Sequence, residues 1–241
     1  MGSCFRFKQF TVVNERSAQK VGTDGVLLGA WVSLTGGERR ILDAGTGTGV
    51  IALMLAQRHP SALITGIDID LPSVEEASLN FSSSPWSGRL SAGQADFREY
   101  AGSFDLVVSN PPFFVNSLKN PSQRRAVARH DETLSHDDLA EGALRLMAPG
   151  GRLAIVLPYA EGWAFLDSAQ TKGLHPVRVC EVRTLADAEP RRLLVEMARE
   201  NPVGGPAGES LVIQACSSPS QSWDNFTEQY RALTRDFYLK F

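Results

Sequence analysis

The four residues Asn110-Pro111-Pro112-Phe113 combine groups that could hold a planar amino nitrogen. They follow residues 104–108, a short apolar run typical of a buried strand. The Asn110 side-chain oxygen and the Pro111 carbonyl are hydrogen-bond acceptors, and proline has no backbone N–H to compete with a donor. Phe113 could stack on the face of a bound base, a contact worth about 1–3 kcal/mol. A nitrogen held by two acceptors would have its lone pair directed at an electrophile.

A glycine-rich turn lies upstream, after the first predicted core strand. It contains Gly45, Gly47 and Gly49, and Asp43 precedes it. The spacing is not the G-x-G-x-x-G of dinucleotide sites, and the turn lacks the lysine of a phosphate-binding loop. Glycines let a backbone approach a ligand closely. A tight strand-to-helix turn also needs glycine for packing alone, so this turn by itself does not define a ligand.

Three aspartates, Asp43, Asp68 and Asp96, are predicted to end three successive strands. Ligands of open α/β sheets bind beyond the carboxyl ends of the strands. Asp68 lies about twenty residues past the turn, where a carboxylate can accept hydrogen bonds from both ribose hydroxyls. Asp96, with Phe97 beside it, is predicted to reach an adenine ring. Each aspartate alone could be a helix cap, but together they disfavour a pyrophosphate. They favour a cationic, ribose-bearing ligand such as S-adenosylmethionine.

Apolar runs alternate with helical patterns along most of the chain, which predicts an α/β fold with a parallel sheet. Strands are expected at 41–45, 62–69, 89–97, 104–110 and 152–158, and helices at 50–58, 72–80, 139–147 and 161–171. Residues 177–182 and 192–197 are two strands joined by a loop, which suggests an antiparallel edge. Residues 211–214 could add a strand, and residues 225–241 are expected to form a terminal helix.

The composition is that of a globular protein with a full core. The chain has 241 residues, of which 43% are hydrophobic, and its net charge of -3 gives no global basic excess to advertise nucleic acid. Its three cysteines are far apart and not in metal-binding spacing, so we expect a reduced, cytoplasmic setting without metal. No stretch approaches the roughly 20 apolar residues of a membrane span.

These motifs resemble the class I S-adenosylmethionine-dependent methyltransferases. Residues 110–113 match the motif of members that methylate a conjugated nitrogen, either of adenine or of a glutamine amide. Residues 7–31, 84–90, 128–139 and 232–241 are similar to the bacterial tRNA (valine) adenine N6-methyltransferases, and the resemblance covers most of the chain. It implies a Rossmann-like three-layer sandwich, with a mostly parallel seven-stranded sheet and an antiparallel edge strand. The expected organisation is a methyltransferase core at 39–200. An extension at 1–38 would cover the cofactor, and a loop, strand and helix at 201–241 would pack on the core.

The implied reaction is methyl transfer from S-adenosylmethionine to the exocyclic N6 of an adenine in a tRNA anticodon loop. The expected catalytic residues are Asn110, Pro111, Pro112 and Phe113. The expected cofactor-binding residues are Gly22, Thr23, Asp24, Asp43, Gly45, Gly47, Gly49, Asp68, Asp96, Phe97 and Asn110. The expected substrate-binding residues are Lys8, Phe114, Arg124, Arg125 and Arg129, because arginines beside aromatic rings suit an unstacked base and its phosphates.

Three alternatives remain open at this point. The acceptor could be rRNA or a protein glutamine, although only about 40 residues precede the first predicted strand, too few for the helical domain of the glutamine enzymes. A nicotinamide-dependent oxidoreductase could share the sheet, but the glycine spacing disfavours it. A non-catalytic RNA-binding module could keep a relict cofactor site. The sequence does not determine the oligomeric state, for which a monomer is favoured.

Overall fold

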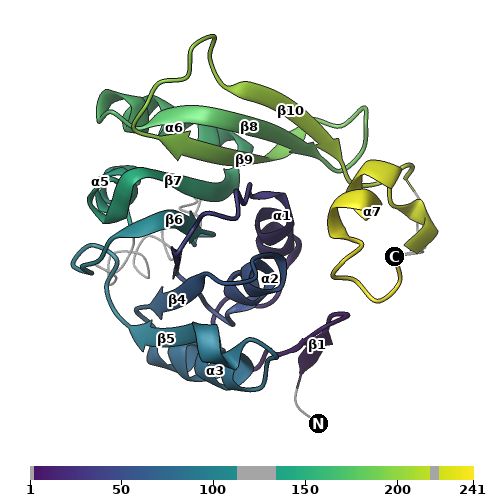
Figure 1. Cartoon of the computed structure of the whole chain (residues 1–241). Helices are drawn as coiled ribbons and strands as arrows, with labels where there is room; N and C mark the ends of the chain where they lie inside the picture. The colour runs from purple at the N-terminus through teal and green to yellow at the C-terminus, as the bar shows by residue number, and fades with distance from the viewer. Residues whose placement is uncertain (1–2, 113–133, 218–222) are drawn as a thin grey trace, which may run out of the picture.

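An eight-stranded sheet runs through the middle of the molecule, with helices on both faces (Figure 1). The computed structural model describes residues 3–112, 134–217 and 223–241. The strand order is β10-β8-β9-β7-β6-β3-β4-β5. In chain order the strands are β3 (Arg40–Ala44), β4 (Leu63–Asp68), β5 (Leu90–Gln94), β6 (Phe104–Ser109), β7 (Met147–Pro158), β8 (His175–Arg183), β9 (Pro190–Ala198) and β10 (Ala207–Val212).

The predicted α/β class is confirmed, but two details of the predicted sheet are wrong. The sheet has eight strands rather than seven, because Ala207–Val212 pairs parallel to β8 along its whole length. Among the described strands of this sheet only β9 runs antiparallel to its neighbours, and it lies between β7 and β8 instead of at the edge. The short β8–β9 loop requires antiparallel pairing. It does not decide on which side of β8 the returning strand docks, so the sequence pattern left that position open.

Two layers of helices cover the sheet. The helices are α1 (Thr23–Trp31), α2 (Val50–Arg58), α3 (Leu71–Ser82), α5 (His136–Leu146), α6 (Tyr159–Thr171) and α7 (Glu228–Thr234), with short 3-10 turns at Ser87–Arg89 and Trp223–Asn225. One buried cluster joins α1, α2 and α3 to one face, and a second joins α5 and α6 to the other. Helix starts follow local chemistry: the Asp70 carboxylate caps α3, and Ser135 and Asp138 form a capping box at α5. None of the described helices is long and apolar enough to cross a membrane.

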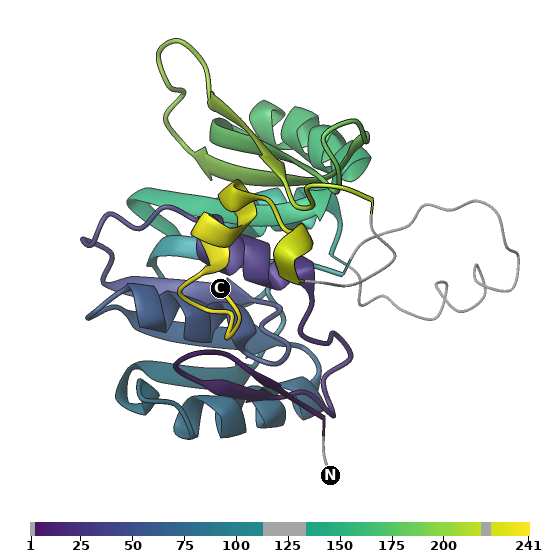
Figure 2. The same cartoon turned by 90° about the vertical axis from the view of Figure 1, so that its right-hand side faces the viewer.

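The two ends of the chain pack together on the α1 and α2 face. A hairpin of β1 (Cys4–Arg6) and β2 (Thr11–Val13) lies beside α3, and the C-terminal segment lies over α1 (Figure 2). The helix predicted over 225–241 is only seven residues long as α7. The chain turns back after Thr234, and the rings of Phe237 and Tyr238 are buried in the core. The helix is shorter than predicted because these residues pack into the core.

Candidate active site

The glycine turn after β3 presents bare backbone at the carboxyl edge of the sheet. Gly45, Gly47 and Gly49 have φ of 72°, 53° and 81°, a left-handed conformation that other residues rarely adopt. A Cβ on Gly49 would lie 2.4 Å from the Phe81 ring, so packing also demands glycine there. The turn therefore leads into α2 with no side chain at these three positions.

Asp43 lies beneath this turn and is fully buried. Its Oδ2 accepts hydrogen bonds from the Thr46 hydroxyl at 2.7 Å and from the Ala52 N–H at 3.2 Å. Its Oδ1 has no hydrogen-bond partner among the described residues. Burial raises the pKa of the Asp43 carboxyl to about 7. A cation bound above the turn would favour the ionised form.

Asp68 ends β4 and is bonded to the same turn. Its Oδ2 accepts from the Gly47 N–H at 2.9 Å, and its Oδ1 accepts from the Asp70 N–H at 3.0 Å. Burial raises the pKa of this carboxyl, and the backbone hydrogen bonds oppose that shift. Each carboxylate oxygen can accept a further hydrogen bond. The geometry suits a ligand with two neighbouring hydroxyls.

Asn110 follows β6, directly beside the turn. The Ser109 hydroxyl donates to the Ala44 carbonyl at 2.8 Å, which ties the ends of β6 and β3 together. The Asn110 side chain is 7% exposed, and its Oδ1 is buried without a partner among the described residues. An unpaired buried oxygen costs free energy, so such an atom needs an explanation. Pro111 is buried and Pro112 is exposed.

A cavity joins the glycine turn, α1 and Asn110. We call it the glycine-turn cavity; it is lined by Gln19, Lys20, Gly22, Gly25, Gly45, Thr46, Gly47, Thr48, Val50, Ile51 and Asn110. The structure thus brings together the predicted residues Gly22, Gly45, Gly47 and Asn110. Asp68 is attached to them through the Gly47 N–H, while Asp43 lies below.

The loop that covers this cavity is anchored by two polar residues that the sequence analysis missed. Glu76 is 2% exposed and accepts hydrogen bonds from the N–H groups of Glu15, Arg16 and Ser17, at 2.6, 2.7 and 3.2 Å. Asn80 bonds the N–H and carbonyl of Val13 and also the Thr48 carbonyl. The available signal was a pair of polar residues at i and i+4 on the apolar face of helix 72–80.

Four predicted cofactor residues have other contacts. The Arg192 guanidinium donates to the Asp24 carboxylate at 2.8 Å, and Asp24 and Thr23 line a different cavity. The Asp96 carboxylate pairs with Arg98 at 2.5 Å, and hydrogen bonds from Arg98 lower the pKa of this carboxyl.

Phe97 is 5% exposed and packs in the core with α5. The predicted substrate residue Lys8 donates through Nζ to the carbonyls of Arg235 and Phe241, at 2.5 and 2.6 Å. In the structure Lys8 therefore joins the two ends of the chain. The remaining predicted residues, Phe113, Phe114, Arg124, Arg125 and Arg129, lie outside the described residues.

Comparison with known proteins identifies the family. The model of the methyltransferase small domain family matches residues 17–162, more than half of the chain. The chain belongs to this family. Its similarity to curated members extends over nearly the whole length. It is 43% identical to the tRNA1(Val) (adenine(37)-N6)-methyltransferase of Parabacteroides distasonis, covering 98% of both chains. It is 38% identical to the protein of the same name from Vibrio campbellii, covering 98% of this chain and 95% of the relative.

Solved structures support the fold. A predicted O-methyltransferase from Agrobacterium tumefaciens superimposes with a TM-score of 0.68 at 18% identity, covering 89% of this chain and 96% of the other. A putative class I S-adenosylmethionine-dependent methyltransferase from Listeria monocytogenes gives a TM-score of 0.56 at 18% identity, over 78% and 62% of the two chains. The fold of this methyltransferase is therefore the class I fold.

The residues around the glycine turn suit S-adenosylmethionine, the cofactor of this family. The ligand carries a sulfonium, an ammonium and a ribose. The buried Asp43 carboxyl and the partly buried Asp68 carboxyl favour positive charge nearby, and the Asp68 oxygens have capacity for ribose hydroxyls. Among the described residues no group of three or more His, Cys, Asp or Glu could hold a metal ion.

Proposed function

We propose that this chain transfers a methyl group from S-adenosylmethionine to the exocyclic N6 of an adenine in the anticodon loop of a valine tRNA. The observation that carries the proposal is the Asn110 amide oxygen. It is buried, has no partner among the described residues, and lies in the wall of the cavity that the glycine turn forms. An acceptor held in this way is suited to an amino group that arrives with the substrate.

The chain's own residues would orient the amine. Asn110 Oδ1 would accept one N–H of the adenine amino group, and the Pro111 carbonyl would accept the other. These two hydrogen bonds favour a tetrahedral nitrogen whose lone pair is directed toward the cofactor, because the protons are drawn to the opposite side. When bound, S-adenosylmethionine supplies an electrophilic methyl group. No general base is required before transfer, since the proton leaves the nitrogen afterwards.

The remaining roles would divide between cofactor and RNA. Asp68 would hold the ribose hydroxyls, while the loop at 14–22 would cover the methionine end. Phe113 and Phe114 would contact the target base, and Arg124, Arg125 and Arg129 would meet its phosphates. We place the enzyme in the cytoplasm, where tRNA is found.

The choice of tRNA over rRNA or a protein glutamine rests on the relatives. Both curated relatives described above carry the name tRNA1(Val) (adenine(37)-N6)-methyltransferase, and they match this chain almost end to end. A structure that matches only in fold carries no such information about the acceptor.

The deciding experiment is incubation with isotopically labelled S-adenosylmethionine and unmodified valine tRNA, followed by mass spectrometry of the nucleosides. We expect labelled N6-methyladenosine at a single position of the anticodon loop. Parallel reactions with rRNA and with a release-factor protein supply the alternatives. Label in either of those acceptors, with none in the tRNA, would refute the proposal.

A further inference from the structure

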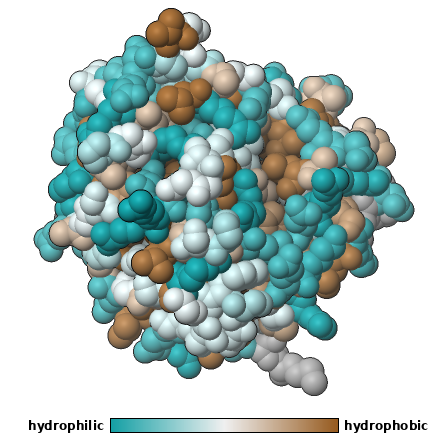
Figure 3. Space-filling model, in the orientation of Figure 1, coloured by the Kyte–Doolittle hydropathy of each residue, from teal (hydrophilic) through white to brown (hydrophobic). Residues whose placement is uncertain are grey.

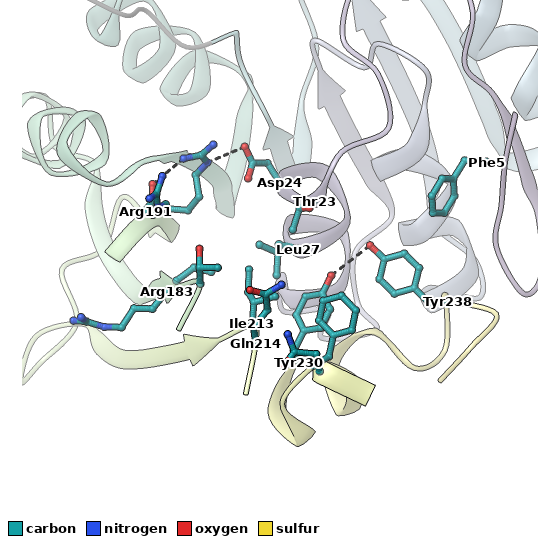
Figure 4. Close-up of a pocket in the computed structure, with 15 residues that line it drawn as sticks. Phe5, Thr23, Asp24, Leu27, Arg183, Arg191, Ile213, Gln214, Tyr230 and Tyr238 are labelled. Carbon is teal, nitrogen blue, oxygen red and sulfur yellow. Dashed lines mark hydrogen bonds and ion pairs between the residues drawn. The ribbon is translucent and has the colours of Figure 1, made fainter. Parts of the chain in front are cut away.

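A second cavity, of about 520 Å³, opens on the other side of α1. Such a volume lies within the roughly 300–1,000 Å³ of small-ligand pockets. We call it the arginine–aromatic pocket; it is lined by Phe5, Thr23, Asp24, Leu27, Val182, Arg183, Thr184, Arg191, Arg192, Ile213, Gln214, Asn225, Phe226, Tyr230 and Tyr238. Figure 4 shows arginines on one side of it and tyrosines from the C-terminal segment on the other. The mechanism described above uses none of these side chains.

Positive charge dominates one side of the pocket. Among the described residues that line it, three are arginines and Asp24 is the one acidic residue. Arg192 is paired with Asp24, and Arg183 is paired with Glu181 at 3.0 Å. Arg191 is exposed, and its guanidinium has no hydrogen bond or ion pair with any residue that the structure describes. The pocket therefore keeps a cation available for an anion at its rim.

Aromatic and apolar groups form the opposite side. The Phe226 ring stacks on Tyr230 with a centroid distance of 5.0 Å, and Leu27 and Ile213 complete the apolar wall. Apolar side chains also gather on the surface where β10 approaches the C-terminal segment (Figure 3). The Gln214 side chain adds an amide that can both donate and accept. A flat ring with polar edges and an attached anion matches all three features.

The pocket is also close to the proposed reaction site. Residues of the first turns of α1 divide between the two cavities. Gly22 and Gly25 line the glycine-turn cavity, and Thr23, Asp24 and Leu27 line the arginine–aromatic pocket. In the ladder between β7 and β9, Arg192 lies opposite Pro158, at the carboxyl end of β7. Both cavities therefore open at the same edge of the sheet. The start of α1 therefore contributes to the walls of both cavities.

We propose that the arginine–aromatic pocket binds an unstacked nucleotide of the RNA that neighbours the methylated adenine, with its base on the Phe226 side and its phosphate at Arg191. This inference rests on the proposed function, because it needs an RNA whose target adenine reaches Asn110 in the wall of the glycine-turn cavity. Single-stranded loops are read by this kind of stacking and charge pairing. Binding two splayed bases on either side of α1 would hold the loop open for the reaction.

The test couples protein variants to RNA variants. The RNAs are anticodon stem-loops that carry an abasic site at each position flanking the target adenine, one at a time. The proteins are wild type, Phe226→Leu, Arg191→Gln and the control Arg39→Gln. Arg39 is exposed and precedes β3, so it lies at the amino ends of the parallel strands, away from the pocket. The control therefore removes the same charge elsewhere. Affinities come from fluorescence anisotropy, and calorimetry with S-adenosylhomocysteine checks the cofactor site.

We expect one flanking abasic site to weaken binding to wild type about fivefold to hundredfold, the range of a lost base stack. Phe226→Leu should bind intact RNA more weakly than wild type by the same factor. Its affinity should then no longer depend on whether that flanking base is present. Arg191→Gln should weaken binding of every RNA and flatten its salt dependence, while Arg39→Gln matches wild type. Cofactor affinity should stay unchanged in all variants.

Equal sensitivity of wild type and Phe226→Leu to every abasic site would overturn the inference, and so would an Arg191→Gln variant that matches Arg39→Gln. If the wild-type protein methylates valine tRNA but either of these results is found, only the inference about the pocket is refuted and the proposed function stands. A wild type that methylates no RNA refutes the proposed function itself, and the inference then falls with it.

Discussion

Replacing Glu76 should loosen the loop that covers the glycine-turn cavity. The Glu76 carboxylate accepts three backbone N–H groups from the loop and is 2% exposed. Hydrogen bonds to a charged group contribute about 1.5–3 kcal/mol each. The loop is partly exposed, so water can replace some of this loss. We therefore expect Glu76→Ala to cost about 3 kcal/mol in total.

That loss divides between global unfolding and local opening of the loop. Gln19 and Lys20 of the same loop line the cavity, so a loop that is open in the free protein must be ordered again on binding. Each 1.4 kcal/mol of ordering weakens affinity tenfold. Asn80 still holds Val13 and retains part of the order. We expect the dissociation constant for S-adenosylhomocysteine to rise about tenfold to hundredfold.

Calorimetry and denaturant unfolding measure the two parts separately. Glu76→Gln keeps the side-chain volume and one acceptor oxygen, so both effects should be intermediate. The matched control is Glu75→Gln, since Glu75 is adjacent, about half exposed and, within the described part of the chain, paired with Arg16 at the surface. It should change neither quantity by more than a few tenths of a kcal/mol. A destabilised Glu76→Ala that binds S-adenosylhomocysteine as wild type does would refute the coupling between loop and cavity.

Three further substitutions test the site itself. Asp68→Ala should raise the dissociation constant for S-adenosylhomocysteine about tenfold to hundredfold in calorimetry, because hydrogen bonds to a charged acceptor are lost. Asn110→Ala should leave that constant nearly unchanged while single-turnover methylation falls a hundredfold or more, since an acceptor aligned in the transition state contributes roughly 2.7–4 kcal/mol. Asp43→Asn should alter the pH dependence of stability. The pKa of Asp43 rises from 3.8 in the unfolded chain to about 7 in the folded protein, so wild type binds more protons when folded. Relative to Asp43→Asn, the free energy of wild-type unfolding should fall between pH 4 and pH 7, by up to about 4 kcal/mol, in denaturant titrations.

The parts of the site that local chemistry determines could be predicted from the sequence. The glycine turn and Asn110 each follow a strand and Asp68 ends one, and the carboxyl ends of parallel strands share one edge of a sheet. Once the strands were assigned, the sequence was therefore enough to predict that these residues lie close together. The predicted roles of these residues remain proposals, because the structure shows their positions and not their ligands.

The parts that depend on distant partners could not be predicted. Asp24 is bonded to Arg192, 168 positions away in the chain. Lys8 is bonded to carbonyls more than 220 positions away, and Glu76 to a loop some 60 positions upstream. A charged residue in a sequence has many potential partners, and only the packed fold selects one. The same reason explains the bounds of the eighth strand: a strand was predicted as an addition at 211–214, but β10 begins at Ala207, in a polar, exposed segment that is ordered by pairing with β8.

Helix α1 links the two cavities because its glycines let it lie close to α2. Gly25 and Gly29 both face that helix: a Cβ on Gly25 would lie 3.4 Å from Val50, and one on Gly29 would lie 2.8 Å from the Met54 sulfur. This close approach places the start of α1 against the glycine turn, where Gly22 and Gly25 line the cavity. The opposite side of the same helix then supplies larger side chains to the arginine–aromatic pocket. The start of α1 thus contributes to both the proposed cofactor site and the proposed RNA site.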